Sequence, residues 1–312
     1  MAHTFVSTEE EVGLFVHEIA RLPTKPPALY LDLEGAQLSR HGTLSLITVY
    51  VQPLDHTYII DVTTLKDKAF NTVATNKSAP VVQGIIDSHA KDFSYASESS
   101  AANCDSMWSS SLLDTNSNPT ASTSMTNITF KSILESSTIT KVFFDVRNDS
   151  DALYSHYGIC LAGIEDVQLQ EVASRPSYQP KKFLRGLAKC IANDIHLPRK
   201  EKAEWTEVKN SGVHLFAPER GGSYAVFDQR PLADVIVRYC VNDVRYLPLL
   251  RDEYLPLLDA RWKAQVALET KRRVVESQSE TYQPQGKNKV VSPWANELMW
   301  AGSLLAELTF EL

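Results

Sequence analysis

The sequence predicts an α/β fold in which helices flank a mixed central β-sheet. Three short runs rich in β-branched and aromatic residues follow one another between residues 28 and 62, and strand-like and helix-like segments then alternate to about residue 275. The chain has 312 residues, of which 43% are hydrophobic and 22% are charged. This usage is ordinary for a globular protein, and it excludes a fibrous protein and wholesale disorder.

The first part of the chain predicts one helix followed by three strands. Apolar residues recur at helical spacing over residues 9–22. Residues 28–33, 43–51 and 57–62 have the composition of strands, and their short polar connections indicate an antiparallel meander. The chain therefore opens with a helix and continues into half of the expected sheet.

A segment of different composition interrupts the pattern over residues 87–127. Serine, threonine, asparagine and alanine dominate there, large apolar residues are sparse, and no hydrophobic period holds. Such a segment cannot bury enough apolar surface to offset the entropy lost on ordering. We therefore expect a flexible insertion, which serves as a tolerated loop rather than as a site.

The rest of the chain predicts alternating helices and strands. We expect helices over residues 130–136, 149–157, 168–174, 181–193, 232–250 and 256–275, and strands over residues 141–145 and 159–167. Residues 1–275 are thus assigned to one domain that contains the insertion. Residues 276–312 form a tail that docks on the core or on a protein partner, and the sequence does not decide between the two.

Composition also indicates the cellular compartment in which the protein is expected. No apolar run approaches the roughly 18–20 residues that span a membrane, and residues 1–11 lack the features of a secretory signal. The cysteines at 104, 160, 190 and 240 are widely spaced, which favours a reducing compartment over a zinc site or a disulfide framework. We expect an intracellular protein, cytoplasmic or nuclear, without a membrane partner. The net charge of −7 argues against a dedicated nucleic-acid binder.

Two carboxylates lie on one face of the first strand. Asp32 and Glu34 are two positions apart in the segment ALYLDLEG, so both side chains leave the same face. Paired carboxylates in a buried strand repel each other and require a cation, for which a divalent metal is the natural candidate. The alternative is that Glu34 lies at a solvent-exposed strand end beside Gly35.

Two further groups of polar residues carry chemistry. Asp145, Asp149 and Asp151 lie at a predicted junction between a strand and a helix, where at least one of them is expected to cap the helix. Tyr239 and Asp243 are four positions apart on a predicted helix, so they share one face, although this pair is common by chance. Taken singly, each signal is weak.

The order of these groups is specific. D-x-E on the first strand, an aspartate at a later strand–helix junction and Y-x-x-x-D on a late helix resemble the three motifs of the DEDDy 3′–5′ exonucleases. KVFFDVRNDSDALYSHYGICLAGIEDVQLQEVAS and RPLADVIVRYCVNDVRYLPLL also resemble the segments of that family. The chain resembles the ribonuclease D and Werner exonuclease superfamily, and within it the Egalitarian-like and fungal exonuclease domain proteins, over about residues 28–257. The resemblance implies an RNase H-like (DnaQ-like exonuclease) sheet.

The resemblance also implies the site and its chemistry. Asp32 and Glu34 are the acids of motif I, Asp149 is that of motif II, and Tyr239 and Asp243 form motif III. These acids hold two Mg²⁺ or Mn²⁺ ions, with Asp32 bridging both, Glu34 and Asp243 on the nucleophile side and Asp149 on the leaving-group side. Tyr239 orients the attacking water, because a phenol with a pKa near 10 is not a strong base at neutral pH.

The choice of the motif II acid stays open between two residues. Asp145 lies where ribonuclease D has no acid, and it therefore contests the assignment of Asp149. Asp151 is the weaker alternative and is expected to be a surface or capping residue. The implied reaction releases nucleoside 5′-monophosphates from the 3′ end of nucleic acid, and bound metal is expected to stabilise the fold.

The implied substrate is single-stranded nucleic acid or a 3′ overhang of RNA or DNA. A local basic surplus between residues 181 and 210 favours phosphate contacts, with a solvated helix face as the alternative. The residues expected to contact nucleic acid are Lys181, Lys182, Arg185, Arg199, Lys200, Trp205 and Arg220. Two rival hypotheses remain: a catalytically weak or inactive RNA-binding or adaptor scaffold of the same fold, and a structural protein whose acids cap helices. The presence of all four acids and the tyrosine favours the enzyme.

Overall fold

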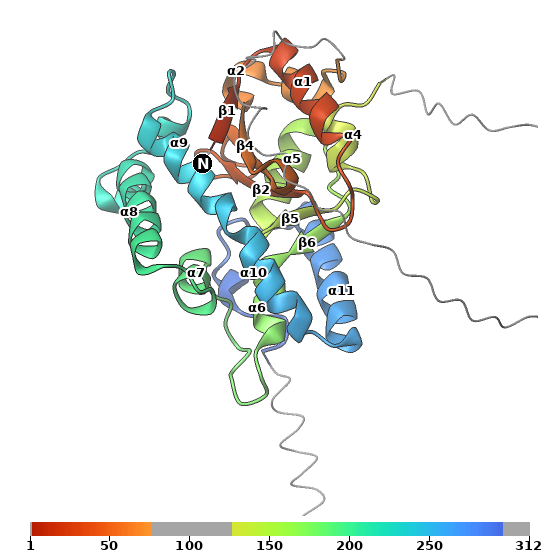
Figure 1. The fold of residues 1–312 in the computed structure, drawn as a ribbon, viewed down its shortest axis with the longest axis vertical. Helices are drawn as coiled ribbons and strands as arrows, with labels where there is room; N and C mark the ends of the chain where they lie inside the picture. The colour runs from red at the N-terminus through yellow and green to blue at the C-terminus, as the bar shows by residue number, and fades with distance from the viewer. Residues whose placement is uncertain (1, 76–126, 296–312) are drawn as a thin grey trace, which may run out of the picture.

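A six-stranded mixed β-sheet organises the chain (Figure 1), and the computed structural model describes residues 2–75 and 127–295. The strands in spatial order are β1 (Ala2–Val6), β4 (His56–Asp61), β3 (Leu46–Val51), β2 (Leu29–Glu34), β5 (Lys141–Phe143) and β6 (Ile164–Asp166). The β2–β3 and β3–β4 pairs are antiparallel, whereas β1 pairs with β4, β5 with β2, and β6 with β5 in parallel. The predicted meander and the mixed sheet are both confirmed.

Helices cover both faces and the β6 edge of this sheet (Figure 1). They are α1 (Glu9–Ile19), α2 (Val62–Leu65), α3 (Lys68–Asn71), α4 (Phe130–Leu134), α5 (Arg147–Tyr157), α6 (Val167–Ser174), α7 (Leu187–Asp194), α8 (Arg199–Phe216), α9 (Asp234–Arg245), α10 (Leu247–Tyr254) and α11 (Ala260–Ser277). Within the described residues, no helix is both long enough and apolar enough to cross a membrane.

The alternation of side chains in β2 separates the main core from the opposite face. Leu29, Leu31 and Leu33 are buried in the largest apolar cluster, which includes residues of α1, α4 and α5. Successive strand residues point to opposite faces, so Asp32 and Glu34 point to the other face, against which α9 packs. A one-residue shift of register would place both carboxylates in the apolar core.

Several elements differ from the expectation. The strand β1 and the helix α8 were not predicted: β1 is short and lies at the sheet edge, and α8 is polar around most of its circumference. The segment expected as one helix over residues 232–250 forms two, α9 and α10, because the helix is interrupted at Tyr246, just before Pro248. Helix α7 begins only at Leu187, since residues 182–184 before it pair with residues 290–292 through backbone hydrogen bonds.

Two parts of the predicted domain organisation lie partly beyond the described residues. The expected insertion over residues 87–127 falls outside them except for Asn127, and so does the end of the tail after residue 295. The described part of the tail packs on the domain: Trp294 is buried, and its ring meets that of Trp262 on α11 edge-on at 5.3 Å. The described part of the tail therefore docks on the core, and the boundary at residue 275 stays a prediction.

A buried carboxylate fixes the junction that leads into α5. The side chain of Asp166, at the end of β6, accepts hydrogen bonds from the backbone N–H groups of Asp145 and Val146 at 3.0 and 3.2 Å. It also accepts one from the guanidinium of Arg273 on α11 at 2.7 Å. Asp166 and Arg273 are both buried. This pair therefore determines where α5 begins.

We expect Asp166→Ala to lower the free energy of unfolding by about 3–5 kcal/mol, because it removes the nearest carboxylate from the buried Arg273 charge and leaves only Asp145 at 3.6 Å. Urea unfolding monitored by circular dichroism measures the change. The matched control is Asp252→Ala on α10, whose side chain is 62% exposed and which should cost less than about 0.5 kcal/mol. Equal effects of the two substitutions would contradict the assignment.

Candidate active site

Three carboxylates from β2 and α9 form one group at the sheet. Oxygen atoms of Asp32, Glu34 and Asp243 all lie within 4.8 Å of one another. Asp32 and Glu34 lie at the end of β2. Asp243 lies on α9, whose buried residues Ile236 and Cys240 pack towards the sheet. Glu34 and Asp32 stay partly accessible, whereas Asp243 is only 4% exposed. Acids that are 209 positions apart in the sequence are thus brought together (243 − 34).

The first turn of α5 brings a fourth carboxylate to the group. Asp149 is 7% exposed, and its Oδ1 atom has no hydrogen-bond partner among the described residues. Burial raises the pKa of Asp149 well above its ordinary value, and the neighbouring charge of Asp32 raises it further. Asp149 lies outside the group within 4.8 Å, but it is in electrostatic contact with it.

The two other aspartates of this region have different roles. Asp145 forms two hydrogen bonds with the guanidinium of Arg147, both 2.6 Å long, so its charge is already paired. Asp151 was expected to be a surface or capping residue and is neither: it is fully buried inside α5 and forms an ion pair with Arg40 at 2.6 Å. The geometry therefore favours Asp149 over Asp145 as the acid of the second motif.

The crowded carboxylates disfavour one another's ionisation. Burial raises the pKa of Asp32 to about 7, and the charge of Asp243 adds to the effect. The pKa of Glu34 is raised well above its ordinary value by burial and then by Asp32. Taking a carboxylate out of water and placing it beside others both disfavour the charged form. Without a metal ion, full ionisation of this group at neutral pH is disfavoured.

Lys209 on α8 is the functional residue that the sequence did not reveal. Its Nζ atom lies 2.5 Å from Oδ2 of Asp243 and donates a hydrogen bond to the hydroxyl of Tyr239 at 3.0 Å. Burial acts to lower the pKa of Lys209, but the Asp243 carboxylate outweighs it and the net pKa is raised. The sequence analysis counted Lys209 only as one charge of a basic stretch. Its position beside Asp243 was not recognised because α8 was not predicted.

Tyr239 is held between α8 and the carboxylates. Its ring meets that of Phe216 edge-on at 5.1 Å, and burial together with the charge of Asp243 raises the pKa of its hydroxyl well above the ordinary value. The hydroxyl is therefore neutral at physiological pH and serves as a hydrogen-bonding group rather than as a base.

The buried acids fit a divalent cation. Oδ1 of Asp243 and Oδ1 of Asp149 are both buried without a hydrogen-bond partner in the described structure. Buried polar atoms are almost always satisfied, so two such oxygens beside further carboxylates indicate a missing electropositive partner. Hard ions such as Mg²⁺ and Mn²⁺ prefer oxygen ligands of this kind.

The residues expected to contact nucleic acid divide into two sets. Lys181 is buried and donates hydrogen bonds to the carbonyl groups of Val172 and Ala173 at 3.1 and 2.8 Å, and Trp205 is 4% exposed. Neither side chain is placed to contact a substrate, because the ammonium of Lys181 and the ring of Trp205 are both buried inside the protein. Arg185 is shared between Glu171 and Asp194. The exposed members are Lys182, Arg199, Lys200 and Arg220, and their role stays a prediction.

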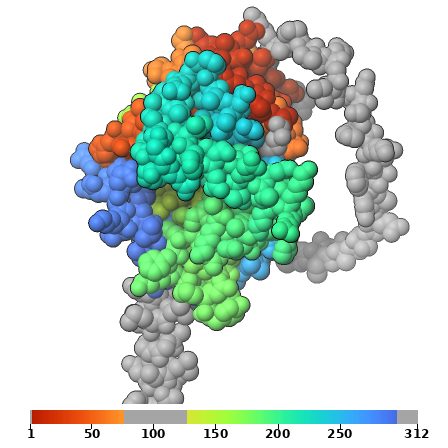
Figure 2. All heavy atoms as spheres, turned by 90° about the vertical axis from the view of Figure 1, so that its left-hand side faces the viewer, coloured from red at the N-terminus to blue at the C-terminus, as the bar shows by residue number. Residues whose placement is uncertain are grey.

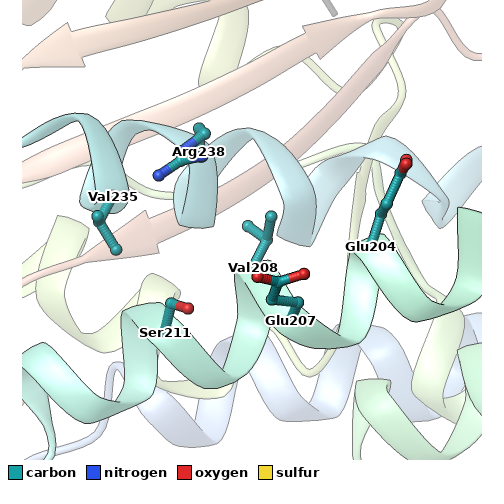
Figure 3. Close-up of a pocket in the computed structure, with 6 residues that line it drawn as sticks. All are labelled: Glu204, Glu207, Val208, Ser211, Val235 and Arg238. Carbon is teal, nitrogen blue, oxygen red and sulfur yellow. The ribbon is translucent and has the colours of Figure 1, made fainter.

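A separate cavity of about 300 Å³ lies between α8 and α9 (Figure 3). Its lining residues are Glu204, Glu207, Val208, Ser211, Val235 and Arg238. Charges of both signs meet there, and none of these residues belongs to the carboxylate group. The cavity is therefore distinct from the candidate active site.

Gly212 allows α8 to approach Tyr239. A Cβ atom at this position would lie 2.3 Å from Cδ2 of the Tyr239 ring, closer than any real contact. We expect Gly212→Ala to displace the ring, lower the free energy of unfolding by about 1–3 kcal/mol and reduce turnover. Thermal unfolding and exonuclease rates measure both effects, with the exposed neighbour Ser211→Ala as the control. Unchanged turnover in Gly212→Ala would show that the ring position is not needed.

Comparison with known proteins agrees with this geometry. The 3′–5′ exonuclease family model matches residues 110–259, which contain Asp149, Tyr239 and Asp243. The structure is similar to Trypanosoma brucei RNase D in its GMP complex, with a TM-score of 0.61 and 16% identity over 96% of this chain and 72% of that one. The same enzyme in complex with RNA U12 gives 0.61 and 16% over 95% and 79%.

A bacterial structure has the same fold. Escherichia coli RNase D, described as an exoribonuclease involved in structured RNA processing, gives a TM-score of 0.51 and 15% identity over 89% of this chain and 51% of that one. A comparison with curated protein sequences finds no match. The family match covers motifs II and III, and the sheet adds Asp32 and Glu34 to them. Residues 110–259 thus match a 3′–5′ exonuclease domain, and the chain as a whole has the fold of the RNase D structures.

Proposed function

We propose that the protein is a metal-dependent exonuclease that shortens single-stranded nucleic acid or a 3′ overhang and releases nucleoside 5′-monophosphates. The observation that carries this proposal is the convergence of Asp32, Glu34 and Asp243 within 4.8 Å, with the unsatisfied Asp149 beside them. Nucleic acid as substrate is supported by the RNase D of Trypanosoma brucei, whose structures contain RNA U12 and GMP.

Each residue of the site has a role in this proposal. Asp32, Glu34, Asp149 and Asp243 would hold two divalent ions, which supply a nucleophilic hydroxide and stabilise the charge on the leaving oxygen. The neutral hydroxyl of Tyr239 accepts a hydrogen bond from Lys209 and orients the attacking water. Lys209 holds the charge of Asp243 and fixes the position of the Tyr239 hydroxyl.

The rival scaffold hypothesis has one observation in its favour. Because the ammonium of Lys209 partly neutralises Asp243, the fold does not depend on metal alone to offset these acids. A scaffold has no use for the other acids, however, and their pKa values are raised with Lys209 in place. Buried carboxylates that destabilise the free protein are typical of catalytic sites.

An exonuclease assay on labelled nucleic-acid strands tests the proposal. We expect stepwise shortening of 3′-overhanging and single-stranded RNA or DNA labelled at the 5′ end, in Mg²⁺ or Mn²⁺ but not in EDTA. Asp243→Asn should reduce the rate by at least about a hundredfold, because it removes one ligand and the partner of Lys209. The matched control is Asp234→Asn, an exposed position in the first turn of the same helix. Tight binding of the strand without shortening in either metal would instead support the scaffold.

The raised pKa values predict how metal and pH act on stability. The folded-state pKa of Asp32, about 7, exceeds the unfolded value near 4, so the folded state binds more protons and its stability falls as the pH rises between these values. From pH 5.5 to 7.5 we expect the free energy of unfolding to fall by about 1–2 kcal/mol more in EDTA than in saturating Mg²⁺.

Urea unfolding at matched pH values, with and without metal, measures this difference. Burial also lowers the pKa of Lys141 to about 7, but that lysine lies at the start of β5 and contributes equally in both conditions. The difference therefore reports on the carboxylate group together with Lys289, whose pKa burial lowers to about 8 and whose charge interacts with that of Asp149. Parallel pH profiles in EDTA and Mg²⁺ would contradict the predicted competition between protons and metal.

A further inference from the structure

The segment that follows α11 borders a hollow in the surface of the molecule. Figure 2 shows a hollow with yellow-green residues from the middle of the chain at its floor, teal residues of α8 and beyond on one side and the blue C-terminal part on the other. The C-terminal wall, defined as residues 278–294, lies outside the part of the chain that the exonuclease family model matches.

Hydrogen bonds at several points hold the C-terminal wall in place. The guanidinium of Arg40 donates to the carbonyl group of Glu280 at 3.4 Å, and that of Arg147 donates to the carbonyl group of Lys289 at 3.0 Å. The backbone N–H of Ser292 donates to the carbonyl oxygen of Lys182 at 2.9 Å. The wall is therefore an ordered part of the domain, fixed on both sides of Lys289.

The C-terminal wall brings a lysine to the first turn of α5. The Nζ atom of Lys289 donates hydrogen bonds to Oδ1 of Asn148 at 2.5 Å and to the carbonyl oxygen of Pro284 at 3.1 Å. Asn148 immediately precedes Asp149, and the hydroxyl of Tyr282 also donates to its amide oxygen at 2.9 Å. The ammonium of Lys289 is therefore held at the residue that precedes Asp149 in the first turn of α5.

Lys289 has the character of an anion-binding residue. Both of its acceptors are neutral, and among the described residues no carboxylate forms an ion pair with it. The nearby Asp145 is already paired with Arg147. An ammonium has three N–H donors, and the two hydrogen bonds use two of them. The Nζ atom also lies 5.5 Å from the centre of the Tyr282 ring. The acids of the site repel a phosphate, and a cation beside Asp149 offsets that repulsion.

We infer that Lys289 binds a backbone phosphate of the nucleic-acid strand in the catalytic cleft, and that residues 278–294 are a part of the substrate site. The inference rests on the proposed function, because it assumes that nucleic acid enters this cleft. Lys289 contributes to binding and positioning of the strand rather than to the chemical step. Its preorganisation by Asn148 and Pro284 reduces the entropy lost when the phosphate is bound.

Binding of a short labelled oligouridylate strand to the full chain tests the inference, with Asp243→Asn as the background that prevents degradation. We expect Lys289→Met to weaken binding about fivefold to tenfold and to make the slope of log affinity against log salt concentration shallower by about 0.7, the value for one phosphate on a single strand. Lys289→Arg should keep most of the affinity. The control is Lys287→Met, an exposed lysine in the same short 3₁₀ helix, which should change neither quantity.

A second variant separates phosphate binding from a structural role. Asn148→Ala removes the acceptor of Lys289 but keeps its charge, so the salt slope should stay that of the background protein. If Asn148→Ala and Lys289→Met weaken binding equally with unchanged slopes, the lysine only supports α5 and the inference is wrong. If the unsubstituted chain neither binds nor shortens any strand, the proposed function fails instead. Normal shortening with equal binding by the Lys289→Met variant overturns this inference alone.

Discussion

Mutual repulsion between buried carboxylates is the constraint around which this molecule is arranged. Asp32, Glu34 and Asp243 have oxygens within 4.8 Å of one another, and Asp149 adds a further charge beside them. Such a group costs free energy in the absence of a cation, and natural folds retain it where the energy is recovered on binding. The ammonium of Lys209 offsets part of the repulsion at Asp243. The buried Oδ1 atoms of Asp243 and Asp149 have no hydrogen-bond partner among the described residues, and they fit the ligand preference of a divalent ion.

The rest of the fold holds these charges where they are. Side chains alternate along β2, so Leu31 and Leu33 are buried in the main core and Asp32 lies on the opposite face. The core therefore holds the backbone of Asp32 in place while its carboxylate stays outside the core. Gly212 lets α8 pack closely on the ring of Tyr239 and thereby brings Lys209 into hydrogen-bonding distance of its hydroxyl. Because the acids are carried by β2, α5 and α9, the packing of these helices on the sheet determines the geometry of the site.

The sequence predicted the parts of this arrangement that have a local signal. Hydrophobic alternation placed Asp32 and Glu34 together, and the spacing of Tyr239 and Asp243 placed them on one helix face. Lys209 was missed because α8 was not predicted, and the buried face of this helix combines Trp205 and Gly212 with a charged side chain that composition alone does not single out. Asp151 was expected to be a surface or capping residue because its partner Arg40 is distant in sequence. Trp205 was expected to contact the substrate because composition does not show which face of a polar helix is buried.

The number of protons released when metal binds tests the central claim most directly. Calorimetric titration of the protein with Mn²⁺ at pH 6.5, repeated in buffers of different ionisation enthalpy, gives this number. The raised pKa values of Asp32, Glu34 and Asp149 predict that binding displaces about one proton or more, and that Asp243→Asn reduces both affinity and release. Metal binding without any proton release, or with the same release in Asp243→Asn, would contradict the assignment of these carboxylates as the metal site.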